Sequence, residues 1–497
     1  MAVTPLKRIA SLALSLLLVT GASAQGPEQA ATDTGKAVPD PVSFVTQHEG
    51  TFNGQSVRYT VTAGEIHLTN DSGAPTASVW SMAYTIDNAA PNRPVTFVFN
   101  GGPGSASVWL HMGLMGPRRV PVSSDADADD GAPPYTVVHN PHSPLDVTDL
   151  VFIDPVGTGF SRPVGKGTGK DFWGLNEDAE SIAQFIRKWI TVNKRWNSPR
   201  YIAGESFGTT RAAAVAYALG GGGQDVALNG LILISQALDY TGSTPVHDNL
   251  IAYVTYLPTM AATAWYHKRA GAGETLDDFV QAARIFAFDE YAPALFKGNT
   301  LSDTEHGRIA ERLAHFTGLP EEYVLQSDLR VLASRFLKEL LRDQGVALGR
   351  LDGRYVRDDI DDAAERPESD AASDAITSAY TTGLNLYLAT ELNVTMDRPY
   401  KTSNRSVGRG WRWKPVPEGQ SWEPSYVNVA RQLSSAMRRN ADLKVLVANG
   451  YYDFATPFFD AEYTFARHGI LKDRVTRDTE GSRYDEVLRS RSHDVCT

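Results

Sequence analysis

The sequence has almost no cysteine. Cys496 is the only one among 497 residues, so an intrachain disulfide cannot form and a zinc site built on cysteines is excluded. Basic charge is also scarce, since 47 Lys and Arg stand against 58 Asp and Glu for a formal net charge of −11. Such an acidic chain offers no electrostatic footprint for DNA or RNA, and we expect no nucleic-acid partner. What remains is a composition with 42% hydrophobic residues, which predicts a globular protein stabilised by burial.

Apolar runs long enough to cross a membrane are missing too. The run Ile9 to Thr20 is shorter than the roughly 20 residues that a bilayer requires. It follows Lys7 and Arg8 and precedes Ala22-Ser23-Ala24, a pattern typical of a secretory signal peptide; a single-span anchor is the alternative. We therefore predict a signal peptide over 1–24, a flexible lead-in over 25–41, and a periplasmic or secreted protein without a membrane anchor after cleavage.

Short apolar runs that end at turn residues predict the buried strands of one sheet. Runs with helical spacing, such as Phe172–Asn193, separate them, and this alternation indicates βαβ units and a mainly parallel sheet. The alternating run Gln55–Leu68 predicts an antiparallel pair with Trp80–Ile86. The predicted class is therefore α/β. Its buried strands are expected at Pro94–Asn100, Asp149–Asp154, Arg200–Ala203, Leu228–Ser235 and Leu443–Ala448.

From about Gly242 the pattern becomes mainly helical. This order fits an α/β core with a helical insertion: a first core part over 42–241, the insertion or cap over 242–435, and a return to the core with a C-terminal tail over 436–497. No internal repeat is visible. The helical runs of the insertion are expected at Leu276–Phe286, Glu305–Phe316, Tyr323–Asp343 and Ala371–Leu392, with an exposed acidic loop at Asp352–Asp370.

The pentapeptide Gly204-Glu-Ser-Phe-Gly208 is the first motif that carries chemistry. It lies between the strand Arg200–Ala203 and the Ala-rich helical run Thr209–Leu219. In a tight strand-to-helix turn the central Ser is exposed, and the free N–H groups of the helix lie behind it. An ordinary Gly-rich turn is the alternative. The context favours Ser206 as a nucleophile.

A nucleophilic Ser requires an acid and a base, which follow it in the order Ser, acid, His in α/β-hydrolases. Asp453 comes directly after the strand Leu443–Ala448, where the carboxyl ends of a sheet hold functional residues, and Asp460 is a weaker competitor. His468 stands before Gly469 at the end of a predicted helix over Phe458–Arg467, which indicates a structural role. His493 is then the remaining candidate for the base.

Two further Gly-rich turns follow predicted strands. The turn Asn100-Gly-Gly-Pro-Gly-Ser-Ala-Ser107 can direct backbone N–H groups into a site and complete an oxyanion hole, although a plain tight turn is the alternative. The turn Asp154-Pro-Val-Gly-Thr-Gly-Phe-Ser161 lacks the Lys of a phosphate-binding loop. We interpret it as a wall of the active site.

Four motifs in the same order resemble the serine carboxypeptidase (S10) family, in its secreted bacterial branch. They are Asn100-Gly-Gly-Pro-Gly-Ser, Asp154-Pro-Val-Gly-Thr-Gly-Phe-Ser, Gly204-Glu-Ser-Phe-Gly-Thr and Asn449-Gly-Tyr-Tyr-Asp. The resemblance runs from about Val42 to Arg467. It implies an α/β-hydrolase fold and the removal of C-terminal residues from peptides with a free C-terminus, usually best at acidic pH, without a metal or another cofactor. It gives no oligomeric state.

The resemblance also implies roles for single residues. By position, Ser206 is the nucleophile and Asp453 the acid, and Gly102 and Phe207 would supply the N–H groups of the oxyanion hole. The chain departs from the family at Val98, where Trp is frequent, and it lacks the disulfides of eukaryotic members. These departures concern substrate preference rather than the reaction.

Asn100 and Glu205 would bind the terminal carboxylate of the substrate. Glu205 can bond to a carboxylate only if the two share a proton, because two ionised carboxylates in contact repel each other. Substrate affinity should therefore fall as pH rises, which accounts for an acidic optimum. The same pair argues against an esterase or lipase, the second functional reading, because an ester has no terminal carboxylate.

The C-terminal tail departs furthest from the family, whose motif around the base resembles Tyr-Glu-Ala-Gly-His-Met. A codon series that spells Val487–Thr497 reads Ser-Tyr-Glu-Ala-Gly-His-Met-Met-Tyr-Val from its second base. We therefore hypothesise a frameshift after about Asp473, in which case His493 only happens to lie near the position of the base. A third reading follows from this tail, namely an inactive protein that binds peptide C-termini.

Overall fold

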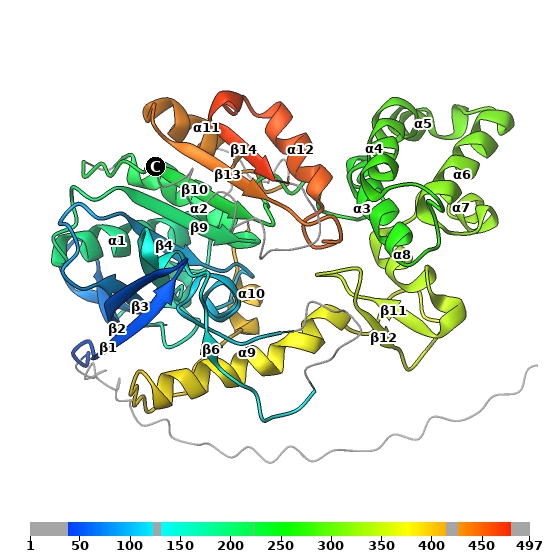
Figure 1. Ribbon diagram of the computed structural model, residues 1–497. Helices are drawn as coiled ribbons and strands as arrows, with labels where there is room; N and C mark the ends of the chain where they lie inside the picture. The colour runs from blue at the N-terminus through cyan, green and yellow to red at the C-terminus, as the bar shows by residue number, and fades with distance from the viewer. Residues whose placement is uncertain (1–37, 123–130, 222, 414–425, 479–497) are drawn as a thin grey trace, which may run out of the picture. The chain divides into compact units, whose positions relative to one another are not determined.

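The computed structural model describes residues 38–122, 131–221, 223–413 and 426–478. Its centre is a ten-stranded sheet with the order β1-β2-β3-β7-β4-β9-β10-β13-β14, to which β8 adds at β3. Every neighbouring pair from β7–β4 to β13–β14 is parallel, whereas β1, β2 and β3 extend the sheet with antiparallel pairs (Figure 1). The predicted mainly parallel α/β sheet is confirmed, as is the antiparallel pair at its edge.

The strands agree closely with the apolar runs of the sequence. The edge strand β1 was not predicted, because its side chains are mostly polar and alternate only between exposed and half-buried positions. Two small hairpins pair β5 (Arg118–Arg119) with β6 (Val138–His139), and β11 (Val346–Leu348) with β12 (Val356–Asp358). The strands of the large sheet are β1 (Ser43–Phe52), β2 (Gln55–Thr69), β3 (Pro75–Ile86), β4 (Val95–Phe99), β7 (Asp149–Ile153), β8 (Arg162–Pro163), β9 (Arg200–Glu205), β10 (Gly230–Ile234), β13 (Lys444–Ala448) and β14 (Val475–Asp478).

Helices cover both faces of the sheet, which explains why its central strands are apolar throughout. Val95, Phe97 and Phe99 of β4 pack with helices of one face, and Val98 packs on the other face. The first face is covered by α1 (Leu175–Val192), α2 (Phe207–Leu219), α11 (Ala430–Arg439) and α12 (Phe458–Arg467). The second is covered by the π-helical segment η1 (Leu110–Met115) and α9 (Ala371–Thr390).

Six further helices, some long and some short, form a second hydrophobic cluster. Figure 1 shows this group, in green and yellow-green, gathered to one side of the sheet. The aromatic side chains of Tyr451, Tyr452 and Phe454, from the loop after β13, belong to the same cluster. The helical group therefore holds a loop of the core. Its members are α3 (Leu250–Tyr266), α4 (Leu276–Phe286), α5 (Ala292–Lys297), α6 (Asp303–Thr317), α7 (Glu321–Gln326) and α8 (Ala333–Glu339).

Two local predictions were wrong. The run Tyr323–Asp343 is not one helix, because Asp328 and Leu329 have φ values of 48° and 62° and end α7 before α8 begins. The expected loop over Asp352–Asp370 contains β12, which pairs with β11. Helical periodicity reports neither a change of backbone conformation at two residues nor a hairpin of three-residue strands.

Some predictions fall on parts of the chain that the structure does not describe. The signal peptide over 1–24, the lead-in up to residue 37 and the tail with His493 all lie outside the described residues. Across the four described ranges, no helix has both the length and the hydropathy needed to cross a bilayer.

Candidate active site

Ser206 stands in the turn between β9 and α2. Its φ of 58° and ψ of −128° lie in a region that residues with a side chain rarely adopt, and such strain is typical of a nucleophile held at the top of a strand. The backbone N–H of Ser206 donates to Ile234 O at 3.0 Å, which ties the turn to the next strand, β10. Ser206 also keeps part of its surface accessible.

The two glycines of the pentapeptide are required by close backbone contacts. A Cβ atom on Gly204 would lie 2.2 Å from Gly208 O, and one on Gly208 would lie 2.8 Å from Phe99 O. Any larger residue would therefore push α2 away from β9 and β4. The turn places the first residue of the helix, Phe207, directly after the Ser.

The loop after β4 lies against the beginning of α2. A Cβ atom on Gly101 would lie 2.5 Å from Phe207 N and 2.8 Å from Gly208 N. Gly102 has a φ of 106°, which favours glycine. Phe207 is the first residue of α2, so its N–H belongs to the free donors of a helix N-terminus. The two predicted oxyanion donors thus lie in adjoining backbone segments.

Asn100 and Glu205 are hydrogen-bonded to each other. Leu110 N donates to Asn100 Oδ1 at 3.0 Å, which leaves the amide nitrogen of Asn100 to donate to Glu205 Oε2 at 2.9 Å. Asn100 is fully buried, whereas Glu205 keeps part of its surface accessible. The pair therefore presents one carboxyl group next to the nucleophile.

The electrostatic surroundings of Glu205 favour its protonated form. Burial raises its pKa to about 7, the hydrogen bond from Asn100 acts in the opposite direction, and the charge of Asp453 raises it further. The repulsion from Asp453 also shows that the turn after β9 and the loop after β13 converge. At acidic pH, Glu205 is thus a neutral hydrogen-bond donor.

Asp453 is held by donors from its own loop. Its Oδ1 accepts from Ala455 N at 2.7 Å and Thr456 N at 3.0 Å, and its Oδ2 accepts from Thr456 Oγ1 at 2.7 Å. Ser235, which follows β10, adds a side-chain hydrogen bond. Burial raises the pKa of Asp453, and these hydrogen bonds lower it. The carboxylate is therefore fixed in one orientation.

The strand register brings these groups to one edge of the sheet. Glu205 pairs with Ile234 of β10, and Ile234 pairs in turn with Ala448 of β13. Ala448 also pairs with Asp478, the last residue of β14, in parallel orientation. The chain after Asp478 thus starts from the edge that carries Ser206, although the predicted base His493 lies outside the described residues.

Asp460 and His468, which competed for catalytic roles in the sequence, take part in a different cluster. Asp460 is fully buried in the first turn of α12, where Gly242 packs against its carboxyl group. His468 Nε2 lies 2.7 Å from Asp239 Oδ2, and Arg467 Nη2 donates to the same oxygen at 2.6 Å. This arrangement favours the structural interpretation of His468.

A segment far along the chain lies on the Gly-rich loops, and sequence reasoning missed it. Ser403 pairs with Ser105, and Lys401 pairs with Gly159 in a second isolated bridge. Asn404 Nδ2 donates to Gly157 O at 2.7 Å. Residues 401–404 thus join the loop after β4 to the turn after β7, a contact for which the sequence carries no local signal.

The turn after β7 is also bonded to the loop after β4 within the core. Asp154 Oδ1 accepts from Ser107 N at 2.9 Å, and burial raises the pKa of Asp154 to about 7. This bond supports the interpretation of the turn as a wall beside the site.

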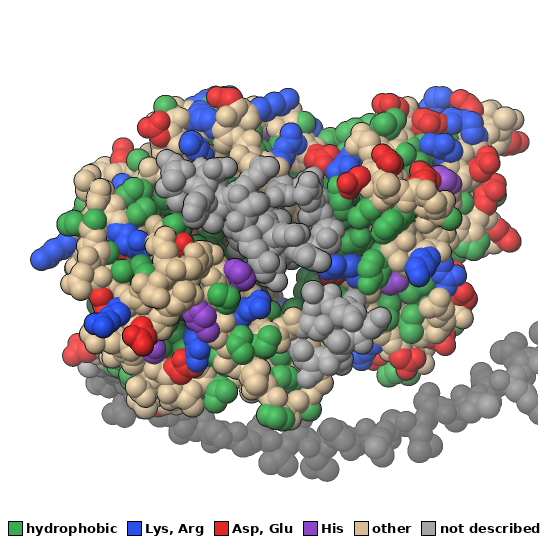
Figure 2. Space-filling model, in the orientation of Figure 1, with side chains coloured by type: hydrophobic (Ala, Val, Ile, Leu, Met, Phe, Trp, Pro, Cys, Tyr) green, Lys and Arg blue, Asp and Glu red, His purple; other side chains and the backbone are tan. Residues whose placement is uncertain are grey.

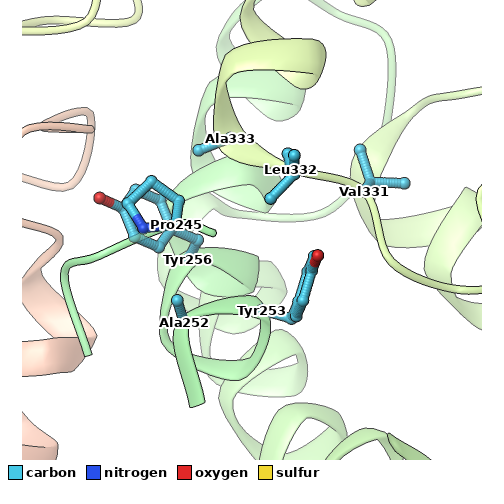
Figure 3. A pocket seen from close by; sticks show the side chains of 7 residues that line it. All are labelled: Pro245, Ala252, Tyr253, Tyr256, Val331, Leu332 and Ala333. Atoms are coloured by element: carbon cyan, nitrogen blue, oxygen red, sulfur yellow. The ribbon is translucent and has the colours of Figure 1, made fainter. Parts of the chain in front are cut away.

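The hollow in the helical group does not coincide with the candidate site. Figure 2 shows acidic and basic side chains interspersed over the visible face. Figure 3 shows a small hollow between α3 and the segment before α8. None of the residues predicted for the site lines it; its walls are Pro245, Ala252, Tyr253, Tyr256, Val331, Leu332 and Ala333.

Comparison with known proteins agrees with this geometry. The model of the serine carboxypeptidase family matches residues 68–269, a range that contains Asn100, Glu205 and Ser206 but not Asp453. Serine carboxypeptidase-like 16 of Arabidopsis thaliana is 27% identical over 154 residues, which are 30% of this chain and 34% of that protein. The pheromone-processing carboxypeptidase KEX1 of Cryptococcus gattii is 28% identical over 200 residues, 38% of this chain and 28% of that protein.

These curated relatives are matched over only about a third of their length or less. The crystal structure of a prohormone-processing carboxypeptidase from Saccharomyces cerevisiae aligns over 86% of this chain and 79% of its own, with a TM-score of 0.50 and 17% sequence identity. That likeness shows a shared α/β-hydrolase fold. The family model and the curated relatives show that the chain is similar to serine carboxypeptidases over part of its length.

Proposed function

We propose that the protein is a serine carboxypeptidase that hydrolyses the C-terminal bond of peptides with a free C-terminus, best at acidic pH. The observation that carries this proposal is the bond between Asn100 and Glu205 next to Ser206. A carboxyl group with a pKa of about 7 remains protonated when a peptide carboxylate, with a pKa near 3.5, is ionised. One proton can then bridge the two groups.

The position of this bridge defines an exopeptidase. Glu205 is the residue before Ser206 in the chain, so a carboxylate bonded to Glu205 places the last peptide bond of the substrate within reach of Ser206. A chain that continues beyond that residue carries an amide there instead of a carboxylate, and it has no anion to share the proton of Glu205. The pair therefore selects for a free C-terminus.

The proposed reaction has two stages. Ser206 Oγ attacks the carbonyl carbon of the last peptide bond while a His base takes its proton, and the N–H groups of Gly102 and Phe207 stabilise the oxyanion. The proton passes to the leaving amine, and the C-terminal residue departs. Water then hydrolyses the acyl-enzyme by the same steps in reverse order.

Asp453 would orient the base. A His that serves Ser206 must lie within roughly 2.6–3.2 Å of its hydroxyl, with Asp453 on its other nitrogen. The chain leaves β14 at the edge of the sheet where both residues stand. His493 is the only His after Asp478 in the sequence as given, and a repaired reading frame would supply another in its place.

We also propose that the protein acts in the periplasm or is secreted. The basic and apolar pattern of residues 7–24 supports this location. The single cysteine cannot form an intrachain disulfide. The three large hydrophobic clusters of the described residues stabilise the fold instead.

The test is a pH-resolved assay on three versions of one substrate: an N-blocked dipeptide, its C-terminal amide, and a p-nitrophenyl ester of the blocked amino acid. We expect kcat/KM for the free acid to exceed that for the amide by at least about tenfold at pH 5, as the loss of a charge-assisted hydrogen bond implies. The advantage should vanish above pH 8. Faster turnover of the amide would exclude a carboxypeptidase.

A further inference from the structure

Helix α2 contains one charged side chain where an apolar one is expected. All of its residues from Phe207 to Ala216 are buried, and Arg211 is among the largest side chains that are completely enclosed, with 1% of its surface exposed. Removal of a guanidinium group from water is costly, so such a group persists only with close partners. The chain has placed it one turn after the nucleophile.

The partners of Arg211 come from both sides of the helix. Its Nε donates to Asp178 Oδ2 of α1 at 2.6 Å, and Asp178 is itself 3% exposed. Its Nη1 donates to the backbone carbonyl of Asn100 at 2.6 Å. Its carbon Cζ lies 5.3 Å from the ring centre of Phe99 and 5.2 Å from that of Phe207. The guanidinium plane is thus fixed by two bonds and two rings.

Two of these partners belong to the site. Asn100 carries the amide that bonds to Glu205, and Phe207 directly follows Ser206. The backbones of the loop and the helix already meet, since a Cβ atom on Gly208 would lie 3.1 Å from the carbonyl of Asn100. Arg211 therefore bonds to a peptide group at which the loop after β4 meets the first turn of α2.

We propose that Arg211, anchored by Asp178, is a positioning residue of this site. It holds the Asn100 peptide against the first turn of α2, so that Asn100, Glu205 and Ser206 keep the spacing that a C-terminal carboxylate requires. This inference rests on the proposed carboxypeptidase function. Arg211 touches no substrate and acts through Asn100.

The planar fork of Arg211 is essential to this role. Nε binds Asp178 while Nη1 reaches the carbonyl of Asn100, so two nitrogens of one rigid group make the two bonds. A Lys ammonium is a point charge without this geometry and cannot reproduce both bonds at once. If burial alone mattered, an apolar pair in place of Arg211 and Asp178 would serve as well or better.

A second buried Arg provides a matched control at the opposite end of β4. Arg195 Nη1 bonds to Asp149 Oδ2 at 2.5 Å, and its Nη2 donates to the backbone carbonyls of Arg93 and Pro94. Both Arg195 and Asp149 are largely buried. This pair has the same construction as Arg211 and Asp178 but supports the amino end of the strand, away from Ser206.

The experiment measures binding, so it does not depend on a working base. Dissociation constants of an N-blocked dipeptide and of its C-terminal amide are determined by calorimetry at pH 5.5 on the full chain. The unaltered protein should prefer the acid by about tenfold or more. Arg211→Lys should reduce this preference at least about threefold, whereas Arg195→Lys should lower the unfolding temperature and leave the preference unchanged.

A second variant covers the case in which Arg211→Lys does not fold. The double variant Arg211→Met with Asp178→Leu replaces the ion pair by apolar groups of similar size and should fold. We expect it to lose most of the preference for the acid. An unchanged preference in either folded variant overturns the role of Arg211. No preference in the unaltered protein contradicts the proposed function instead, so the two failures are distinguishable.

Discussion

Two carboxyl groups, of the buried Asp453 and of the half-buried Glu205, stand at the same edge of the sheet, and their surroundings differ. Asp453 accepts bonds from two backbone N–H groups and from the hydroxyl of Thr456, whereas Glu205 accepts a bond from the amide of Asn100. Several donors stabilise an ionised carboxylate, and a single donor in a buried place leaves the neutral form favoured. This difference supports the proposed roles, in which Asp453 orients a base and Glu205 carries a proton.

The largest expected effect concerns the base that Asp453 would orient. A version whose tail reads Ser-Tyr-Glu-Ala-Gly-His-Met-Met-Tyr and continues should exceed the given chain in kcat by on the order of 10⁴–10⁶, the amount that a lost base costs in such triads. The measurement compares kcat of the two proteins on one blocked dipeptide. Equal activity, together with its loss in His493→Ala, would establish His493 as the base and refute the frameshift hypothesis.

The next prediction distinguishes Asp453 from Asp460 as the acid that orients the base. In the version with the restored frame, Asp453→Asn should lower kcat about 10⁴-fold, because the base loses its orienting acceptor. Asp460→Asn is the control: burial raises the pKa of Asp460 well above its usual range, so an amide resembles the neutral acid already present. A comparable loss of kcat in both variants would contradict the assignment of Asp453.

Glu205→Gln should change the pH dependence of binding rather than the chemical step. In the unaltered protein, KM for free peptides should rise about tenfold per pH unit above about 7, as Glu205 loses its proton. An amide can donate at any pH, so KM of the variant should be nearly flat over this range. KM for an ester without a carboxylate should change little on the substitution. If KM for peptides kept the pH dependence of the parent, Glu205 would have no role in binding.

The same pKa predicts a change in stability. Because the pKa of Glu205 rises from 4.5 to about 7 on folding, the unfolded chain releases its proton first, and the free energy of unfolding falls between pH 4.5 and 7. Asp154, with a pKa of about 7, contributes in the same direction. Urea unfolding at pH 5 and pH 7.5 should show a smaller decline of the unfolding free energy in Glu205→Gln than in the parent. An equal decline in both proteins would mean that another group causes the pH dependence.

The smallest effect is expected at the pair formed by His468 and Asp239. His468→Gln removes one bond to the buried Asp239, and it should cost about 1–2 kcal/mol of unfolding free energy while kcat changes less than about twofold. Urea unfolding and a standard assay measure both quantities. If kcat instead fell a thousandfold at unchanged stability, His468 would belong to the catalytic machinery.

The fold was largely predictable because its signals are local. Continuous apolar runs such as Val95–Phe99 can exist only as strands covered on both faces, and the turns that end them are rich in glycine. The pentapeptide around Ser206 also predicts its own geometry, because both of its glycines are required. A Cβ atom would lie 2.2 Å from a backbone oxygen at Gly204 and 2.8 Å from one at Gly208. By contrast, the polar edge strand β1 and the break at Asp328 lack such a signal.

By itself the sequence predicted most of the strands and helices, the strand-to-helix turn at Ser206 and the place of Asp453 after the last long apolar run, because each depends on residues within a few positions of one another. Only the tertiary structure decided which groups meet. Leu110 turns the Asn100 amide towards Glu205, and the guanidinium of Arg211 binds the carbonyl of Asn100, 111 positions away. A buried charge and the direction of an amide depend on partners from distant strands and helices, and these partners become neighbours only when the sheet has formed.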